Sequence, residues 1–429
     1  MTVRPLLIRG GRIVDPSQSM DKTADLLIID GKIETISDKI GGMEGIIEID
    51  AKGQLVTPGL IDVHVHLREP GGEHKETIET GVKAAVSGGF TAVCAMPNTD
   101  PVIDGPAGIR LVLAQAEKAA RARVHPLGAI SKRQEGKSLA AIGEMVEAGA
   151  VGITDDGNPV MDGGLMRMAM EYAKSFNIPV ADHPEDLDLS RAGTMNEGLI
   201  STRLGLLGKP NISEDIHIIR DLLLAEVTHS RVHLQHVSTA FGVEMIRQAK
   251  NRGVQVTAEA TPHHLILTEN EVDGYNTNAK MNPPLRTLED CAAVVEGFSD
   301  GTLCVYATDH APHHYDEKEQ AFADAPNGIV GLETSLGIGL TCLVNEGVVD
   351  LSTLVDRMSC SPARAFNLPG GTLKKGSLGD VTIIDPGMTW VVDSSEFMSK
   401  SRNTPFEGLE LEGRASKTIV GGEIVWDGF

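Results

Sequence analysis

The chain has 429 residues, of which 41% are hydrophobic and 23% charged, as in an ordinary globular protein with room for a large and a smaller domain. Its net charge of −22 disfavours phosphate backbones and anionic membrane surfaces, so we expect no nucleic-acid partner and no membrane association. Five cysteines without a CxxC pair, no signal-type leader and no apolar stretch of spanning length predict a cytoplasmic protein without disulfides.

Residues 1–56 have the pattern of short β-strands, because β-branched residues cluster between glycines and aspartates and helical periodicity is absent. The segment IRGGRIVD at Ile8–Asp15 predicts a hairpin around its Gly-Gly pair, although such pairs are common. The predicted strands are Leu6–Ile8, Gly11–Val14, Asp25–Ile29, Lys32–Ile36 and Ile46–Ile49.

Residues 57–371 have a different rhythm, in which apolar runs of strand length alternate with helical stretches rich in Ala, Glu and Lys. Eight such strands alternating with helices favour a (β/α)8 barrel, an α/β fold whose chemistry lies at the carboxyl ends of the strands. Helices are predicted at Gly108–Arg121, Gly164–Ser175, Ser213–Thr228 and Ala240–Arg252. The predicted strands are Ile61–His66, Thr91–Met96, Val124–Ile130, Val151–Asp155, Pro179–His183, Val232–Val237, Val254–Ala260 and Thr302–Thr308.

Residues 372–429 again have a strand pattern, at Val381–Ile384, Trp390–Val392 and Lys417–Trp426. The segment IVGGEIVWD at Ile419–Asp427 echoes the one near the amino terminus and also predicts a Gly-Gly hairpin. We therefore expect residues 1–56 and 372–429 to form one composite β-sandwich domain beside a catalytic barrel at 57–371.

The predicted strand ends carry residues that can bind metal ions. His64 and His66 are alternate residues of the first barrel strand, so their side chains share a face and can hold one ion. An HxH pair alone is weak, because two unrelated histidines give the same pattern. Four further strands, however, also end in His or Asp, at Asp155–Asp156, His183, His236 and Asp309. This repetition predicts a metal centre at the barrel mouth.

Four histidines and two aspartates suit two divalent ions bridged by one carboxylate, with zinc as the first choice and manganese or cobalt as alternatives. The remaining histidines are expected on surfaces or in loops, at His74, His125, His217, His229 and His233. His263 and His264 follow the seventh strand, and we expect them to have structural or supporting roles.

The chain resembles the amidohydrolase superfamily and, within it, the class I bacterial dihydroorotases. The resemblance spans essentially the whole chain, and the combination of HxHxREPG, MPNT and KMNPPLR is specific. Hydantoinases and allantoinases share the metal scaffold without usually having this full set. The matching segments are PGLIDVHVHLREPG (58–71), KETIETG (75–81), AMPNTDP (95–101), TDDG (154–157), QHVS (235–238), TAEATPHHL (257–265), KMNPPLR (280–286), ATDHAPH (307–313) and GIVGLET (328–334).

The resemblance implies a role for each metal-site residue. His64 and His66 would hold one zinc ion, and His183 and His236 the other. Asp156 would bridge the two ions where many relatives use a carbamylated lysine, although alternation along a strand lets either Asp155 or Asp156 face inward. Asp309 would bind metal and carry the proton for a hydroxide held between the metals.

The resemblance also implies the substrate contacts. Arg68, Asn98 and His313 match residues that hold a substrate carboxylate, for which a guanidinium fork is well suited. Asn282 and the Asn327–Gly328 backbone would contact the ring amides. Two departures stand out: the fifth strand continues as ADHPED, without the cysteine often found after its histidine, and Asn327 replaces a frequent aromatic residue.

The function implied is the reversible cyclisation of N-carbamoyl-L-aspartate to L-dihydroorotate in de novo pyrimidine (UMP) biosynthesis. The polar segment 313–328 is expected to be either a mobile lid or an ordinary exposed loop. A dihydropyrimidinase or allantoinase is the alternative enzyme, although a carboxylate clamp disfavours it. The alternative without enzymatic activity is a scaffold protein that serves only as a partner of aspartate carbamoyltransferase. We expect a homodimer, and aspartate carbamoyltransferase as a possible partner.

Overall fold

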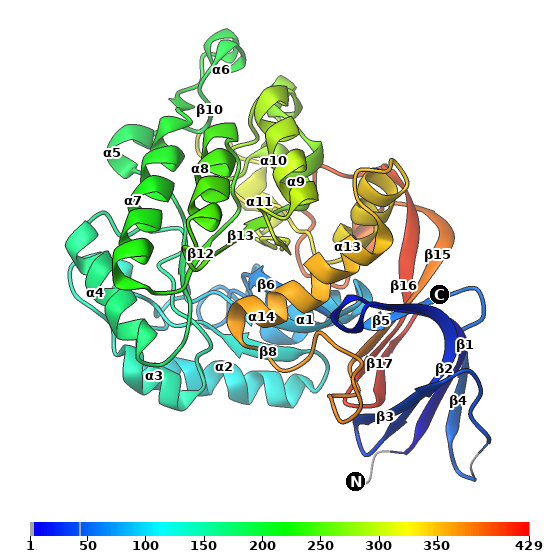
Figure 1. The fold of residues 1–429 in the computed structure, drawn as a ribbon. Coiled ribbons are helices and arrows are strands. Elements are labelled where there is room, and N and C mark those ends of the chain that lie inside the picture. Colours follow the sequence, from blue (N-terminus) through cyan, green and yellow to red (C-terminus); the bar gives the residue numbers. More distant parts are fainter. Residues whose placement is uncertain (1–3, 43, 429) are drawn as a thin grey trace.

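The computed structural model describes residues 4–42 and 44–428. Strands from both ends of the chain form one sheet, drawn in blue and in orange to red in Figure 1, in the order β17-β16-β15-β5-β1-β2-β3 with β4 beside β1. Its halves share an apolar core, which confirms the smaller β domain; the predicted domain boundaries stay a prediction. The strands are β1 (Leu6–Asp15), β2 (Met20–Ile29), β3 (Lys32–Ser37), β4 (Ile47–Asp50), β5 (Leu55–Pro58), β15 (Val381–Val391), β16 (Glu410–Val420) and β17 (Glu423–Asp427).

The two Gly-Gly pairs have different structures. The carboxyl-terminal pair, Gly421–Gly422, makes the predicted hairpin turn between β16 and β17. The hairpin predicted at Gly10–Gly11 is wrong, because β1 continues through this pair and is paired with β2 on both sides of a register shift. A side chain at Gly11 would come within 2.5 Å of Val56 Cγ2, so this glycine permits close packing of strands rather than a reversal.

The eight predicted barrel strands follow one another in parallel around a ring. Hydrogen bonding gives a three-stranded sheet, β6-β7-β8, and a four-stranded sheet, β9-β12-β13-β14. Parallel bridges from Ile153 to Gly128 and Val180 join the sheets on one side, and Val65 pairs with His310 on the other. The fourth run thus contributes single bridges rather than a continuous strand. The strands are β6 (Leu60–Val65), β7 (Phe90–Ala95), β8 (Arg123–Pro126), β9 (Val180–Asp182), β12 (Val232–Leu234), β13 (Val256–Ala260) and β14 (Val305–Tyr306).

Helices surround this ring (Figure 1). The four helices predicted from sequence are α2, α4, α7 and α8, with ends shifted by at most two residues. The connection from α5 to α7 includes the short strands β10 (Met195–Asn196) and β11 (Gly208–Lys209), which lie on either side of α6 in the sequence. The α-helices are α1 (Ile78–Ser87), α2 (Pro106–Ala119), α3 (Ile142–Ala148), α4 (Gly163–Lys174), α5 (Leu187–Ser190), α6 (Leu199–Leu204), α7 (Ile212–Thr228), α8 (Ala240–Asn251), α9 (Pro262–Ile266), α10 (Leu288–Asp300), α11 (Tyr315–Lys318), α12 (Ser335–Ile338), α13 (Leu351–Val355) and α14 (Ser361–Phe366).

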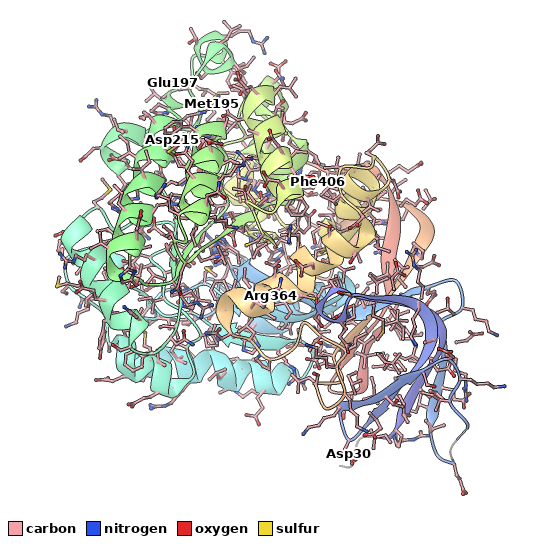
Figure 2. All side chains as sticks on the ribbon, viewed as in Figure 1. Asp30, Met195, Glu197, Asp215, Arg364 and Phe406 are labelled. Atoms are coloured by element: carbon pink, nitrogen blue, oxygen red, sulfur yellow. The ribbon has the colours of Figure 1, made fainter. Side chains whose placement is uncertain are left out.

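The lower barrel is filled by apolar side chains, which leaves its upper end for polar ones. Ile61 and Val63 pack there with residues of the other strands and with Phe366 of α14. The register of β6 against β7 shifts between Asp62 and Val65. Side chains after the shift no longer continue the inward–outward alternation of Ile61 and Val63, and His64 therefore also points inward. Side chains fill the space between the strands and the surrounding helices (Figure 2).

The structure bears on the cysteines and on the absence of apolar segments of spanning length. All five cysteines are free, as predicted. Across residues 4–42 and 44–428, no helix has both the length and the apolar character needed to cross a bilayer.

Candidate functional site

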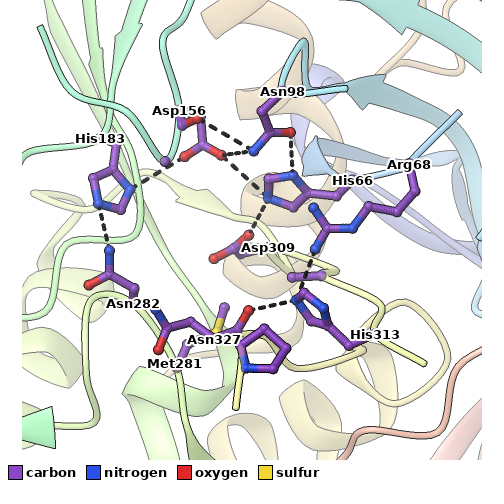
Figure 3. Close-up of a pocket in the computed structure, with 13 residues that line it drawn as sticks. His66, Arg68, Asn98, Asp156, His183, Met281, Asn282, Asp309, His313 and Asn327 are labelled. Atoms are coloured by element: carbon purple, nitrogen blue, oxygen red, sulfur yellow. Dashed lines mark hydrogen bonds and ion pairs between the residues drawn. The ribbon is translucent and has the colours of Figure 1, made fainter. Parts of the chain in front are cut away.

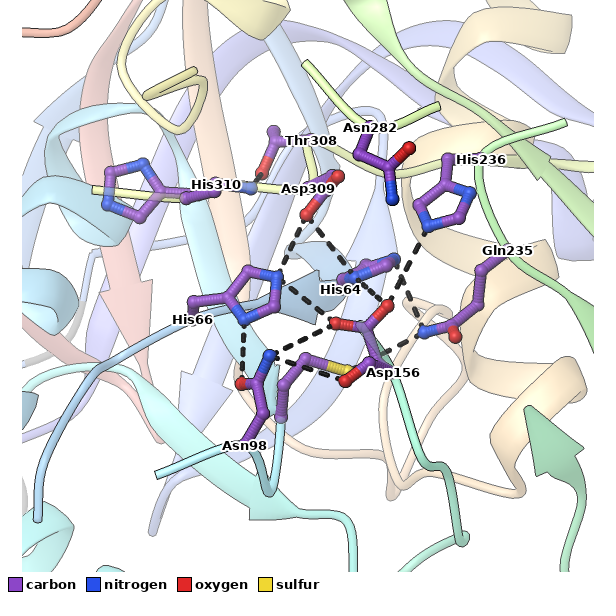
Figure 4. A network of polar contacts seen from close by, with 12 residues as sticks. His64, His66, Asn98, Asp156, Gln235, His236, Asn282, Thr308, Asp309 and His310 are labelled. Atoms are coloured by element: carbon purple, nitrogen blue, oxygen red, sulfur yellow. Dashed lines mark hydrogen bonds and ion pairs between the residues drawn. The ribbon is translucent and has the colours of Figure 1, made fainter. Parts of the chain in front are cut away.

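Six buried side chains meet at the carboxyl ends of the barrel strands. Figure 4 labels them except for His183, which Figure 3 labels. Asp156 lies between the histidines: its Oδ1 is 3.5 Å from His64 Nε2, 3.4 Å from His183 Nδ1 and 3.7 Å from His236 Nε2. Its Oδ2 is 3.4 Å from His66 Nε2. The predicted residues are thus brought together, and we call them the mouth cluster: His64, His66, Asp156, His183, His236 and Asp309.

The structure decides which of the two neighbouring aspartates faces inward. Asp155 points away from the mouth, where its carboxylate accepts hydrogen bonds from the backbone N–H groups of Ile130 and Ser131 at 2.8 and 3.1 Å. Asp156 points the other way, into the mouth, where its carboxylate lies beside the histidines.

Asp309 completes the cluster from the end of the eighth strand. Its Oδ1 is 2.9 Å from His66 Nε2 and 3.3 Å from His64 Nε2. Asp309, His236 and Arg68 all have left-handed backbone conformations, with φ values of 47°, 32° and 60°. Such conformations are unfavourable for residues other than glycine and gather at functional sites, where the surrounding structure holds a side chain in a required direction.

The charges of the mouth cluster favour a bound cation. Burial opposes a charge on His64, but the carboxylates of Asp309, Glu259 and Asp156 outweigh it and raise the pKa of His64 well above its ordinary value. Burial likewise opposes a charge on His183, yet Asp156 and Glu185 raise the pKa of His183 to about 10. The cluster therefore attracts positive charge into a buried place.

Its donor atoms also have the spacing of a metal site. Two groups of three, His64–Asp156–His236 and His64–His66–Asp309, each have their ligand atoms within 4.8 Å of one another. His64 Nε2 is buried and has no hydrogen-bond partner among the described residues. Imidazole and carboxylate donors without thiolates suit a divalent ion such as zinc.

A third carboxylate, which sequence reasoning missed, supports these histidines from below. Glu259 of β13 is fully buried, and its Oε1 lies 2.5 Å from His64 Nδ1. This contact places the proton of His64 on Nδ1 and leaves Nε2 free to bind metal, as carboxylates behind metal-binding histidines do. Its Oε2 lies 3.0 Å from His233 Nε2. The only hint in the sequence is an acidic residue in the middle of an apolar strand.

A cavity of about 330 Å³ opens above the mouth cluster (Figure 3). Arg68 lies on its wall, and Arg68 Nε donates to Pro312 O at 3.1 Å. His313 Nε2 is 2.8 Å from Asn327 O, so the ring proton of His313 lies on Nε2. Arg68 Nη2 is 3.3 Å from the same nitrogen, which therefore cannot accept from it, and this guanidinium donor stays available to another acceptor. The lining residues are His66, Arg68, Asn98, Asp156, Gly157, His183, Met281, Asn282, Asp309, Ala311, His313, Pro326 and Asn327.

The remaining predicted contacts lie at the edges of this cavity. Asn98 Oδ1 is 3.0 Å from His66 Nδ1, and Asn282 Nδ2 is 3.1 Å from His183 Nε2, so both amides also orient histidines. Lys209 Nζ donates to Asn282 Oδ1 at 2.7 Å. Gly328 lies behind the wall rather than on it, with its carbonyl oxygen accepting from Asn403 Nδ2 at 2.9 Å.

The histidines expected on surfaces or in loops divide into two groups. His74 and His229 are exposed as expected. The expectation is wrong for His125, which is half-buried on β8, and for His217 and His233, which are buried on α7 and β12. These three face inward because a barrel has an interior and a helix-covered layer, and polar residues in either can be satisfied by buried partners.

His263 and His264 are both buried beside the mouth. His264 Nε2 lies 3.0 Å from Pro283 O, and its Nδ1 lies 2.8 Å from Thr261 Oγ1. His264 thus ties α9 to the loop that carries Asn282, which fits a structural role.

Comparisons with known proteins agree with this geometry. A family profile described as dihydro-orotase-like matches residues 53–241. The dihydroorotases of Pelobacter propionicus and Geobacter metallireducens are each 52% identical to the chain over 421 residues, covering 98% of it and 99% of the relative. Among solved structures, the L-hydantoinase (dihydropyrimidinase) of Arthrobacter aurescens is 28% identical with a TM-score of 0.89, covering 100% of this chain and 96% of the other. The D-hydantoinase (dihydropyrimidinase) of a Thermus species is 26% identical with a TM-score of 0.85, covering 98% and 94%.

Proposed function

Because the chain belongs to the dihydroorotase family, we propose that its mouth cluster and cavity interconvert N-carbamoyl-L-aspartate and L-dihydroorotate with two bound zinc ions. The chain is a cyclic amide hydrolase of pyrimidine biosynthesis, and what the proposal adds is the residues and the metals that do the work. The observation that carries it is the position of Arg68 on the wall of a cavity whose floor is the mouth cluster.

The mouth residues fit a pair of metal ions. We assign His64 and His66 to one ion, His183 and His236 to the other, and Asp156 to the bridge, because Asp156 has an oxygen within 3.7 Å of each histidine. Bound zinc ions lower the pKa of water and polarise a carbonyl group, which supplies a nucleophile near neutral pH.

Arg68 provides recognition of the substrate's carboxylate. Its guanidinium is half-buried at the cavity wall and has donors left over after its bond to Pro312 O. A guanidinium binds a carboxylate strongly, because its planar donors match the two oxygens. Asn98 and His313 lie on the same cavity, and Asn98 would add a donor to the carboxylate, while Asn282 and the backbone at Asn327 would meet the ring amide.

Asp309 is the proton carrier in this proposal. Burial opposes ionisation of Asp309, but His64 and His66 outweigh it and lower the pKa of this carboxyl group, so it begins as a base. In the hydrolytic direction, water adds to the ring carbonyl, Asp309 accepts its proton, and the C–N bond breaks as Asp309 passes that proton to the leaving nitrogen. In the biosynthetic direction, the same atoms move in reverse.

The test is metal analysis coupled to an assay with L-dihydroorotate, dihydrouracil and allantoin. We expect two zinc ions per chain and turnover of L-dihydroorotate alone, since the neutral substrates do not use Arg68. Substituting Arg68→Met should remove turnover of L-dihydroorotate and leave the zinc content unchanged. Turnover of dihydrouracil or allantoin at a similar rate would refute the assignment, and a metal-free inactive chain would favour the non-catalytic alternative.

We also propose that the protein acts as a homodimer. The outer face of α7 exposes four apolar side chains at helical spacing, Ile212, Ile216, Leu223 and Val227. Exposed apolar side chains along one helix face favour an association surface. Light scattering should give twice the chain mass, and Leu223→Asp with Val227→Asp should give the monomer. Partnership with aspartate carbamoyltransferase and cytoplasmic location stay predictions, the first testable by adding that enzyme to the assay.

A further inference from the structure

Two buried lysines donate to backbone carbonyl groups of the segment that forms one wall of the cavity. Lys280 Nζ donates to Phe322 O at 2.6 Å, to Ala323 O at 3.0 Å and to Ala325 O at 2.6 Å, and lies 5.3 Å from the centre of the Phe322 ring. Its side chain thus ties together the start of the segment. Only 4% of Lys280 is exposed.

Lys318 plays the same part at the other end of the segment. Its Nζ donates to Pro326 O at 2.9 Å and to Gly328 O at 3.1 Å, and only 5% of the residue is exposed. A buried ammonium group costs several kcal/mol unless its protons are bonded. Because the bonds of both lysines go to main-chain oxygens, the lysines fix the path of residues 322–328 rather than one side chain.

The path of residues 322–328 determines the positions of two groups in the substrate cavity, Asn327 and His313. Asn327 O receives the proton of His313 Nε2 at 2.8 Å, so the placement of Asn327 sets the direction of the His313 ring. Gly328 follows with φ 154°, and a side chain there would meet Ala311 O at 2.5 Å, so the segment lies tightly against the strand-eight loop. Movement of 322–328 would therefore displace Asn327 and release His313.

We propose that Lys280 and Lys318 are positioning residues that hold segment 322–328 as a fixed wall of the substrate cavity. The inference rests on the proposed function and deepens it, because it names what presents His313 and Asn327 to the substrate. Opening the whole of 313–328 as a lid would strip both ammonium groups of their partners. Lys318 itself belongs to α11 and is anchored by these bonds, so motion of the predicted lid is confined to the exposed residues on either side of it, Tyr315–Asp316 and Glu319–Gln320.

The experiment compares Lys280→Met and Lys318→Met with Lys250→Met, using L-dihydroorotate. Lys250 is a matched control, since its Nζ also donates to a backbone carbonyl, Gly301 O at 2.9 Å, but at the amino-terminal end of the strands. Each cavity-side variant should raise KM about 10-fold or more and change kcat less than about 3-fold, as expected for loss of charged hydrogen bonds that support binding. The control should leave both constants unchanged.

Unchanged KM in folded Lys280→Met and Lys318→Met, or an equal rise in the control, would overturn the proposal. If a variant does not fold, amide hydrogen exchange in the unaltered protein decides. The amides of Ala325 and Gly328, which donate to Ala321 O and Lys280 O, should exchange at least about 10-fold more slowly than those of the exposed residues Tyr315 and Asp316. Equal rates would refute the fixed wall. Absence of L-dihydroorotate turnover in the parent would instead refute the proposed function and leave the exchange result to stand.

Discussion

Two buried clusters of histidine and aspartate lie back to back across strand β9, and they differ in charge balance. His183 points into the barrel mouth, whereas the preceding residue, Asp182, points outward to α7, because neighbouring residues of a strand face opposite sides. There it meets side chains of one turn of that helix. We call this second group the strand–helix cluster: Asp182, His217, Arg220 and Asp221.

The donor atoms in the two clusters have the same metal-like spacing, within 4.8 Å. In the strand–helix cluster, however, Arg220 Nε lies 2.8 Å from Asp221 Oδ1 and supplies the positive charge. Burial, together with Arg220, accordingly lowers the pKa of His217 to about 4, while carboxylates raise that of His183 to about 10. Ligand spacing alone therefore does not identify a metal site; a deficit of positive charge and an open cavity distinguish the mouth.

The sharpest way to separate the clusters is the same amide substitution in each. Asp309→Asn should lower turnover of L-dihydroorotate by about 10³-fold, because the proton carrier is lost, while zinc content stays largely intact. Asp221→Asn is the matched control in the strand–helix cluster and should leave turnover per folded molecule unchanged. Near-normal turnover in Asp309→Asn would remove its assigned role. Both are measured by steady-state kinetics with metal analysis.

The mouth cluster could be predicted from the sequence because strand ends in a barrel converge, so His or Asp after several apolar runs implies one site. The role of Glu259 could not be predicted, because a single acidic residue in an apolar strand does not reveal its partner. Only the structure shows that the Glu259 carboxylate contacts His64 beneath the mouth. His217 could not be placed either, because helical periodicity gives its face but not the carboxylate on β9 that the face meets. The hairpin prediction at Gly10–Gly11 was wrong for a related reason, because a Gly-Gly pair occurs both in hairpin turns and in strand bulges.

Removing the internal cation should affect only the strand–helix cluster. Arg220→Met leaves Asp182 and Asp221 buried without their guanidinium, which we expect to reduce the free energy of unfolding by about 3–5 kcal/mol. Zinc content and kcat of the folded fraction should not change. Denaturant unfolding of the metal-loaded protein measures the loss. Loss of zinc in this variant would show that the two clusters are one electrostatic unit.

Removing the carboxylate behind His64 should have a smaller effect, confined to the mouth. Glu259→Gln keeps the shape but weakens the bond that sets the proton of His64 on Nδ1, so zinc affinity should fall about 10- to 100-fold. Competition with a chelator of known affinity measures this change. Glu185→Gln is the comparison at the cavity edge, where Glu185 Oε2 lies 3.0 Å from His183 Nε2. It tests whether the position of a carboxylate beside a metal-site histidine changes its effect on zinc affinity. Unaltered affinity in Glu259→Gln would deny it a supporting role.

The smallest expected effect is the contribution of His217 to acid stability. Its folded-state pKa, about 4, is lower than the value near 6.5 of an unfolded chain, so its contribution to stability is present above pH 6.5 and is lost as the pH falls toward 4. Between pH 7 and pH 5 this amounts to about 1–2 kcal/mol. His217→Gln removes the titrating ring, so unfolding by denaturant should lose that much less stability over this interval than the parent does. An equal loss in both proteins would mean that His217 is already charged beside Asp182 and Asp221, and that the strand–helix cluster, like the mouth, gathers positive charge rather than excluding it.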